Sequence, residues 1–277
     1  MQTTPSHDPV MPRRKCGAME AHHRLLEDYP DFRLTLGDLE HQTRARLAQA
    51  LVMPPQPVII PVVVHIVYRT PDERISPGQV ASQIDALSRD YRRNNADRAN
   101  IPEVWSGLAT DSLIQFALAT KDPLGAVTSG ITYTQTQTAS FGTDDRVKSI
   151  QTGGADAWPR DQYLNLWVCT LGGGLLGYAQ FPGGPATTDG VVILNTAFGT
   201  TGTAAAPFNL GRTATHEVGH WLNLRHIWGD TEDCTGSDFV DDTPNAQHPN
   251  FDTPTFPHIS CNNGPKRRHV HELHGLC

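Results

Sequence analysis

The sequence predicts an α/β fold of the α+β type, and two patterns carry this prediction. Several runs of β-branched and apolar residues, typical of buried strands, recur between residues 58 and 199. Helical patterns interrupt and follow these runs, one beginning near residue 77 and one near residue 212. The order strand, helix, strands, helix and irregular tail favours one domain with a mixed sheet.

Three parts follow one another along the chain. Residues 1–15 are polar and Pro-rich and are predicted to be disordered, whereas residues 17–50 have helical spacings and many charges. A Pro-rich break then predicts a linker, so residues 1–56 form an appendage to a main domain at 57–265. Residues 266–277 form a separate tail.

The main domain opens with residues 58–68, which are apolar on both faces and predict a buried central strand. Ser76 and Pro77 then form a helix start, as N-cap and first helical residue. The Gly-rich stretch 172–184 is predicted to be an irregular, exposed strand, and a second helix begins near Arg212. Further strands are predicted at residues 113–120, 130–136, 163–171 and 190–199.

Charge and hydropathy exclude some classes of function. The 277 residues carry a formal net charge of -7, and the pI is about 6.0, which argues against general nucleic-acid binding. Pro61 interrupts the longest apolar run, at 58–67, so no membrane-spanning segment is expected. The N-terminus has no apolar core of a signal peptide. The five cysteines leave at least one thiol without an internal partner.

The chemistry-bearing motif is "HEVGHWLNLRH", residues 216–226. His216 and His220 are four residues apart, so on a helix they share one face and can both bind a tetrahedral zinc ion. Glu217 lies beside them, where its carboxylate can accept the proton of a zinc-bound water as this water attacks a carbonyl group. These residues predict a hydrolytic zinc site.

His226 is the candidate third ligand. On a continuous helix it would lie about 240° around the axis from His220, so the helix must end between them. Asn223 is the expected end, because asparagine tolerates the left-handed conformation. The alternative is a surface helix with scattered histidines. With this composition H-E-x-x-H should arise by chance about 0.02 times in such a chain, and the third histidine lowers this to roughly one in a thousand.

The extended motif H-E-x-x-H-x-x-[G/N]-x-x-H resembles that of the metzincin metallopeptidases, and "HEVGHWLNLRHIWGD" resembles specifically the pappalysin family, which includes the ulilysin-like and cytophagalysin-like enzymes. The resemblance covers residues 15–265 and extends to "IPVVVHIVY" at 60–68 and "LNLWVCTLGGGLLGYAQFPG" at 164–183. It implies a metzincin-like fold: a twisted mixed sheet, a backing helix, an active-site helix and a small irregular C-terminal subdomain, here incomplete. Asn223 stands where the family often has glycine.

This resemblance also implies an activity and its regulation. The protein would be a zinc endopeptidase whose rim strand pairs with the backbone of peptide or protein substrates. "RKCGAMEAHHRLL" resembles a pro-segment whose cysteine, here Cys16, occupies the fourth zinc position in a latent form. Residues 1–56 would then be this pro-segment, and cleavage before Pro61, for example near Arg44 or Arg46, would activate the enzyme. The family resemblance implies an extracellular location.

Two structural features are implied in the lower subdomain. Cys234 and Cys261 match positions that are disulfide-bonded in the family. An oxygen-rich cluster matches a region where relatives carry structural calcium, and the alternative is a solvated acidic turn. Its residues are Asp238, Asp241, Asp242 and Thr243. Cys169 and His65, both in strand-like runs, are expected to be a core thiol and a hydrogen-bonded structural histidine.

The methionine-containing turn of metzincins has no counterpart in this sequence, because no methionine follows Met53. The tail "KRRHVHELHGLC" at 266–277 can be encoded by DNA that, read one base later, gives Asn-Gly-Asp-Met-Phe-Met-Asn-Tyr-Met-Asp-Tyr, a segment of the family type. We therefore expect an aberrant, frameshifted tail. Its three histidines are not expected to form a second metal site.

Two readings of function remain open on sequence grounds. The first is a zinc-dependent endopeptidase made as a latent precursor. The second is a catalytically inactive, truncated zinc-binding protein that lacks the methionine turn. A zinc hydrolase that does not act on peptides is a weaker third reading, since it would leave the peptide-binding rim without a role.

Overall fold

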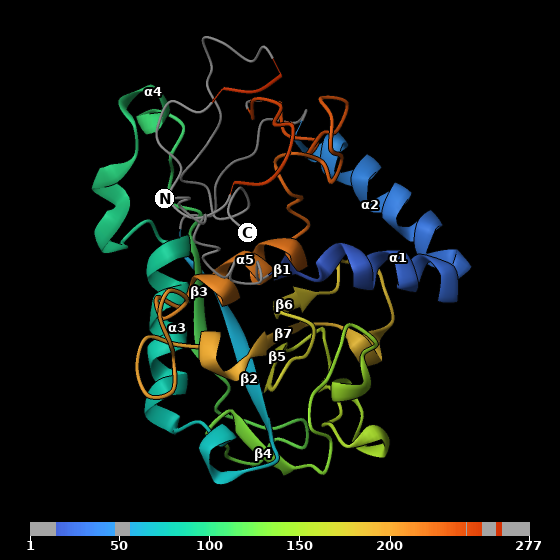
Figure 1. Cartoon of the computed structure of the whole chain (residues 1–277), viewed down its shortest axis with the longest axis vertical. Coiled ribbons are helices and arrows are strands. Elements are labelled where there is room, and N and C mark those ends of the chain that lie inside the picture. Colours follow the sequence, from blue (N-terminus) through green and yellow to red (C-terminus); the bar gives the residue numbers. More distant parts are fainter. Residues whose placement is uncertain (1–14, 48–55, 242, 251–258, 262–277) are drawn as a thin grey trace, which may run out of the picture.

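A seven-stranded mixed sheet lies at the centre of the computed structural model, which describes residues 15–47, 56–241, 243–250 and 259–261 (Figure 1). The strand order is β1-β6-β7-β5-β2-β3, and β4 also pairs with β2. All pairings are parallel except that of β6 with β7. The strands are β1 (Lys15–Cys16), β2 (Val58–Tyr68), β3 (Ile114–Leu118), β4 (Ile131–Gln135), β5 (Leu164–Cys169), β6 (Leu175–Ala179) and β7 (Val191–Leu194).

The central position of β2 follows from its sequence, as predicted. One edge pairs with β5, from Val62 opposite Leu164 onward, while the other edge pairs first with β3 and then with β4. From Val62 to Val67 the side chains on both faces of β2 are buried because the sheet is covered on both sides, whereas Val58 and Ile59 at its start are exposed. A strand without a polar face is typical of parallel sheets.

Two helices cover one face of the sheet and enclose the largest apolar cluster. The backing helix α3 (Pro77–Tyr91) begins where predicted, with the Ser76 hydroxyl accepting a hydrogen bond from the Gln79 amide at 3.1 Å. Helix α5 (Arg212–Trp221) lies against β6, β7 and α3. Val80, Leu87 and Val218 are fully buried in this cluster with side chains of β2, β5 and β7. The two helices therefore hold the motif against the sheet.

The N-terminal region, residues 15–47, is helical as predicted, and it also joins the sheet. Helices α1 (Ala18–Asp28) and α2 (Pro30–Leu47) extend from β1 along one side of the molecule, and α2 runs toward the C-terminal segments (Figure 1). The expectation of an exposed strand at 172–184 is wrong, because all five residues of β6 are buried. Strand β1 and helix α1 cover this edge.

Short helices and irregular chain make up the remainder. The short helices are α4 (Glu103–Ser106) and the 3₁₀ turns Pro71–Glu73, Ala96–Asn100, Arg146–Lys148, Ile150–Thr152, Ala186–Thr188 and Asn195–Ala197. Beyond α5 the described chain is irregular, as predicted. The tail at 266–277 lies outside the described residues. In the described part of the chain no helix is long and apolar enough to span a membrane.

Candidate metal centre

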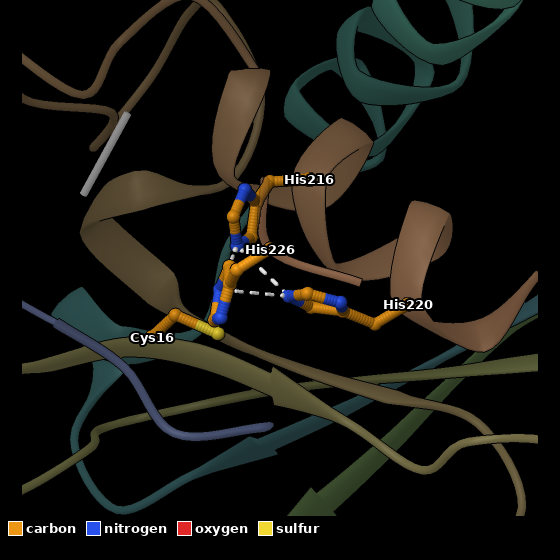
Figure 2. A group of neighbouring side chains, drawn as sticks. All are labelled: Cys16, His216, His220 and His226. Atoms are coloured by element: carbon orange, nitrogen blue, oxygen red, sulfur yellow. Dashed lines mark hydrogen bonds between the residues drawn. The ribbon is translucent and has the colours of Figure 1, made fainter. Parts of the chain in front are cut away.

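Three imidazoles converge beside helix α5. His216 and His220 project from successive turns of the helix, and His226 follows it in the chain (Figure 2). Their Nε2 atoms are 3.1 Å apart for His216 and His220, 3.1 Å for His220 and His226, and 3.4 Å for His216 and His226. All three rings are buried. The structure therefore brings together the three residues that the motif spacing selects.

The turn at Asn223 makes this convergence geometrically feasible. Asn223 has φ 75°, the left-handed conformation expected at this position. The amide of Leu224 donates to the carbonyl oxygen of Gly219 at 2.9 Å, which closes the last turn of the helix. The chain then reverses and returns His226 to the face that carries His216 and His220.

Hydrogen bonds at the far side of two rings fix their tautomers. His220 Nδ1 lies 2.8 Å from the carbonyl oxygen of Leu224, and His226 Nδ1 lies 2.6 Å from Oδ1 of Asp230. Both partners are acceptors, so each Nδ1 carries a proton and each Nε2 presents a lone pair to the common centre. Facing lone pairs repel one another unless a cation lies between them.

The donor set fits a tetrahedral zinc ion. Zinc–nitrogen distances of about 2.0–2.1 Å in tetrahedral geometry place two nitrogen ligands about 3.3–3.4 Å apart. The separations between Nε2 atoms given above are close to this value. The hydrogen bonds that the Nδ1 atoms donate to Leu224 and Asp230 are the type of support that zinc-bound imidazoles have in proteins.

Cys16 of the N-terminal region is the fourth member of the cluster. Its Sγ and one ring nitrogen of each of the three histidines all lie within 4.8 Å of one another (Figure 2). The thiol also donates to Oε2 of Glu217 across 3.6 Å. Cys16 therefore lies close to both the converging imidazoles and the carboxylate of the motif.

Glu217 lies in an almost water-free position, with 1% of its surface exposed. Burial raises the pKa of Glu217 to about 8, and the hydrogen bond from Cys16 partly opposes this rise. A cation among the three imidazoles would favour the ionised form and lower this pKa. A Cβ atom on Gly177 of β6 would lie 3.0 Å from Cγ of Glu217, so only glycine fits between strand and carboxylate.

The edge of β6 that faces away from β7 is occupied by the N-terminal region. The amide of Lys15 donates to the carbonyl oxygen of Gly174 at 3.1 Å, and the amide of Gly17 donates to the carbonyl oxygen of Gly177 at 2.9 Å. An apolar cluster continues this interface where β6 ends. It consists of Ala18, Leu25, Phe32, Leu36 and Phe181.

Several other sequence expectations concern the surroundings. Cys234 and Cys261 form a disulfide bond. The ring of His65 is hydrogen-bonded to the hydroxyl of Thr132 at 2.8 Å and to Oδ1 of Asn165 at 3.1 Å, and Cys169 is fully buried. Both residues are therefore structural, as predicted.

The acidic cluster in the lower subdomain is described in part. The carboxylate of Asp238 is buried and accepts a hydrogen bond from the amide of Val240 at 3.0 Å. Asp241 is exposed, Thr243 is partly buried, and Asp242 lies outside the described residues. The described atoms include no grouping of three acidic side chains around one point.

Sequence reasoning missed Asp230, Gly177 and Arg225. Asp230 could have been found, because it is four residues after His226 in "HIWGD". The part played by Gly177 depends on how closely β6 approaches α5, which no local pattern encodes.

Comparisons with known proteins agree with this site. The family model described as "Pregnancy-associated plasma protein-A", peptidase family M43, matches residues 146–269. "Extracellular metalloprotease 1" of Coccidioides posadasii is 38% identical over 124 residues, which are 42% of this chain and 41% of that protein. The "Extracellular metalloprotease" of Pyricularia oryzae is 46% identical over 88 residues, 29% of each chain. The matched segments thus span less than half of these curated relatives.

Solved structures match over more of the chain. A point mutant of Tannerella forsythia promirolysin superposes with a TM-score of 0.86 at 42% identity, covering 95% of this chain and 87% of that one. Mature mirolysin of the same organism, in complex with a cleaved peptide, superposes with a TM-score of 0.77 at 46% identity. The match covers 80% of this chain and 85% of that one.

The fold and the site together define a metalloprotease of the metzincin class. Within this class, the chain belongs to the pappalysin family, peptidase family M43.

Proposed function

We propose that this protein is a zinc-dependent endopeptidase made in a latent form. One observation carries the proposal: three imidazole nitrogens converge on one point, and the buried carboxylate of Glu217 lies beside them. Three neutral nitrogen donors with an open fourth position are typical of catalytic zinc.

The chain's own residues supply binding and proton transfer. Zinc held by His216, His220 and His226 supplies an activated water and polarises the substrate carbonyl group. Glu217 accepts the proton of the attacking water and passes it to the leaving amine. The buried position of Glu217 keeps its carboxylate a strong base until the proton arrives.

Peptides are the substrate class that suits the edge of β6. This edge offers backbone groups to a strand of another segment, as β1 illustrates through its bonds to Gly174 and Gly177. Mirolysin has been solved with a cleaved peptide. We assign the same class of ligand to this chain, with peptide or protein substrates bound along β6.

Latency rests on residues 1–56 acting as a pro-segment. With zinc bound, Cys16 would hold the fourth position as a thiolate, and β1 would occupy the substrate's place on β6. Arg44 and Arg46 are exposed in the last turn of α2, where an activating protease can reach them. The proposed location is extracellular, as the names of the curated relatives state for those proteins.

Calcium at Asp238, Asp241, Asp242 and Thr243 remains part of the proposal. The buried carboxylate of Asp238 supports it, because hard cations bind carboxylate oxygens. Equilibrium dialysis with calcium tests it, and a chain that binds no calcium at millimolar concentrations contradicts it.

The activity is tested on the full chain after limited trypsin cleavage near Arg46. The cleaved chain is expected to hydrolyse a quenched peptide, and 1,10-phenanthroline is expected to abolish hydrolysis. The matched Glu217→Ala variant should bind one zinc ion per chain but lose activity by about a thousandfold or more, because proton transfer is lost.

The inactive zinc-binding protein is the competing reading. It predicts that wild type and Glu217→Ala bind zinc equally and show the same chelator-insensitive background. A wild-type rate above that of Glu217→Ala excludes it. A chain that hydrolyses small esters but no peptide would instead favour the zinc hydrolase that does not act on peptides.

A further inference from the structure

Among the described residues, two ion pairs join the N-terminal region to the rest of the chain. They differ in whether the partner in the main domain keeps a counter-charge after the N-terminal region is removed. Arg24 pairs with Asp145, and Glu40 pairs with Arg225. Asp145 has a second partner, because Nζ of the buried Lys148 lies 2.8 Å from its Oδ1. Asp145 therefore stays neutralised when the N-terminal region is removed.

Arg225 has no such replacement among the residues that the structure describes. Its Nη2 lies 3.6 Å from Oε1 of Glu40, and this is its only ion pair within the described ranges. Only 15% of the Arg225 side chain is exposed while Glu40 is in place. Cleavage and release of residues 15–47 would thus uncover a guanidinium group that has lost its carboxylate.

Two aromatic rings hold this guanidinium group in position. Its central carbon lies 4.8 Å from the ring centre of Phe181 and 5.7 Å from that of Phe239. Such contacts restrict the rotamers of arginine and leave its edge free for hydrogen bonding. An arginine that is already ordered loses little entropy when it binds a ligand.

Arg225 lies beside the three histidines and the end of β6. It directly precedes His226, and Phe181 follows β6, with its ring centre 5.4 Å from that of His220. Phe181 also contacts Leu25 and Phe32 of the N-terminal region, so this surface faces the segment that covers the site. A peptide that replaces β1 along β6 would pass Arg225 near the Ala179 end of the strand.

We propose that Arg225 forms a carboxylate-binding subsite at the end of the uncovered β6 edge, which Glu40 occupies in the latent form and an acidic group of the peptide substrate occupies afterwards. The planar guanidinium group suits a carboxylate, because two parallel N–H groups can donate to its two oxygens. This inference rests on the proposed endopeptidase function and adds a substrate preference to it.

The test uses peptides that differ by one group. After trypsin treatment of the full chain and removal of the released region, kcat/KM is measured for C-terminally amidated peptides with Glu or Gln at each position around the cleaved bond. At one position Glu should be favoured about tenfold. A third series has Gln throughout and a free C-terminus, so it separates a side-chain carboxylate from a terminal one.

Arg225→Gln should bring the Glu-to-Gln ratio to about one, and Arg225→Lys should leave an intermediate ratio. The matched control is Arg89→Gln, since Arg89 is an exposed arginine paired with Asp85 on α3, and it should keep the wild-type ratio. Because each ratio is taken within one variant, partial misfolding cancels. An equal ratio in wild type and Arg225→Gln, or no acidic preference at any position, overturns the proposal.

A binding measurement separates this proposal from the function on which it rests. The zinc-loaded Glu217→Ala chain, trypsin-treated in the same way, is titrated with the labelled peptides by fluorescence anisotropy. If no peptide is hydrolysed by wild type, the endopeptidase function fails. If peptides with Glu bind more tightly than peptides with Gln, and the double variant Glu217→Ala with Arg225→Gln loses this difference, the subsite is still supported. Equal binding of the two kinds of peptide would refute it.

Discussion

The Oδ1 atom of Asp230 lies 2.6 Å from Nδ1 of His226, so the carboxylate sets the tautomer of the third histidine. Asp230→Ala should weaken zinc binding by about 10- to 100-fold, because His226 loses its orientation and part of its basicity. Competition with a fluorescent zinc chelator measures this. Asp233→Asn, in the same loop but fully exposed, is the control and should bind zinc as wild type does. Unchanged affinity in Asp230→Ala would contradict the assigned role.

Gly177→Ala should reduce kcat while zinc stays bound. The added methyl group would lie 2.8 Å from the carbonyl oxygen of Val192 and 3.0 Å from Cγ of Glu217, so the carboxylate must move. A displacement of this size should cost about tenfold to a hundredfold in rate. Gly107→Ala, where a Cβ atom meets nothing within 4 Å, is the matched control. Retained kcat would show that Glu217 is not held by this contact.

Cys16→Ala should make the uncleaved chain active. The substitution removes the sulfur near the three imidazoles and its contact with Glu217, and leaves the rest of the N-terminal region in place. Hydrolysis of a short quenched peptide before any trypsin treatment should rise by about tenfold or more, as the fourth zinc position opens. Cys169→Ala changes a buried thiol in β5 that is not part of the His–Cys cluster and should stay latent. An uncleaved Cys16→Ala chain as inactive as wild type would show that β1 on the edge of β6, and not the thiol, maintains latency.

His65 should make the fold less stable in acid. Burial lowers the pKa of His65 from 6.5 to about 4, with the Asn165 hydrogen bond opposing this shift. Below pH 6.5 the unfolded chain therefore takes up a proton that the folded chain does not take up until about pH 4. The free energy of unfolding should fall by about 1.4 kcal/mol per pH unit in this window, about 3 kcal/mol in total.

Urea unfolding at several pH values between 7 and 4 measures this dependence. His65→Gln should reduce the slope, and His41→Gln, an exposed histidine on α2, should leave the slope as in wild type. If His65→Gln and wild type had the same slope, His65 would not be the group responsible.

The Cys234–Cys261 disulfide should stabilise the chain that follows the metal centre. The two residues are separated by 27 positions, and cross-linking a loop of this size contributes about 3 kcal/mol. The local apolar cluster is small, with Ile227, Trp228 and Ala246. The double substitution of both cysteines by serine should lower the midpoint of thermal unfolding and admit proteases near Asp241. Loss of neither stability nor protease resistance would argue against this role.

Much of the candidate metal centre could be predicted because its geometry is local. The four-residue spacing of His216 and His220 fixes their common face, and the left-handed turn at Asn223 returns His226 to it. The buried strand β2 and the Ser76 helix start also follow from short-range patterns.

Long-range contacts could not be predicted in this way. A strand of two residues such as β1 has no periodicity to detect, so the burial of β6 was missed. The pairing of Glu40 with Arg225 joins residues far apart in the sequence, and neither residue type specifies its partner. The disulfide was expected only through the family resemblance, since five cysteines allow several pairings.

The short strand β1 also affects how the protein must be produced. In a chain made without residues 1–47, the edge of β6 that pairs with β1 would have free backbone N–H and C=O groups. Such an edge can pair with another copy of the chain. Apolar Phe181 and Leu175, buried in the described fold, would be less covered in the same chain. We expect the N-terminal region to protect the newly made protein from self-association, so the full chain is the form to express.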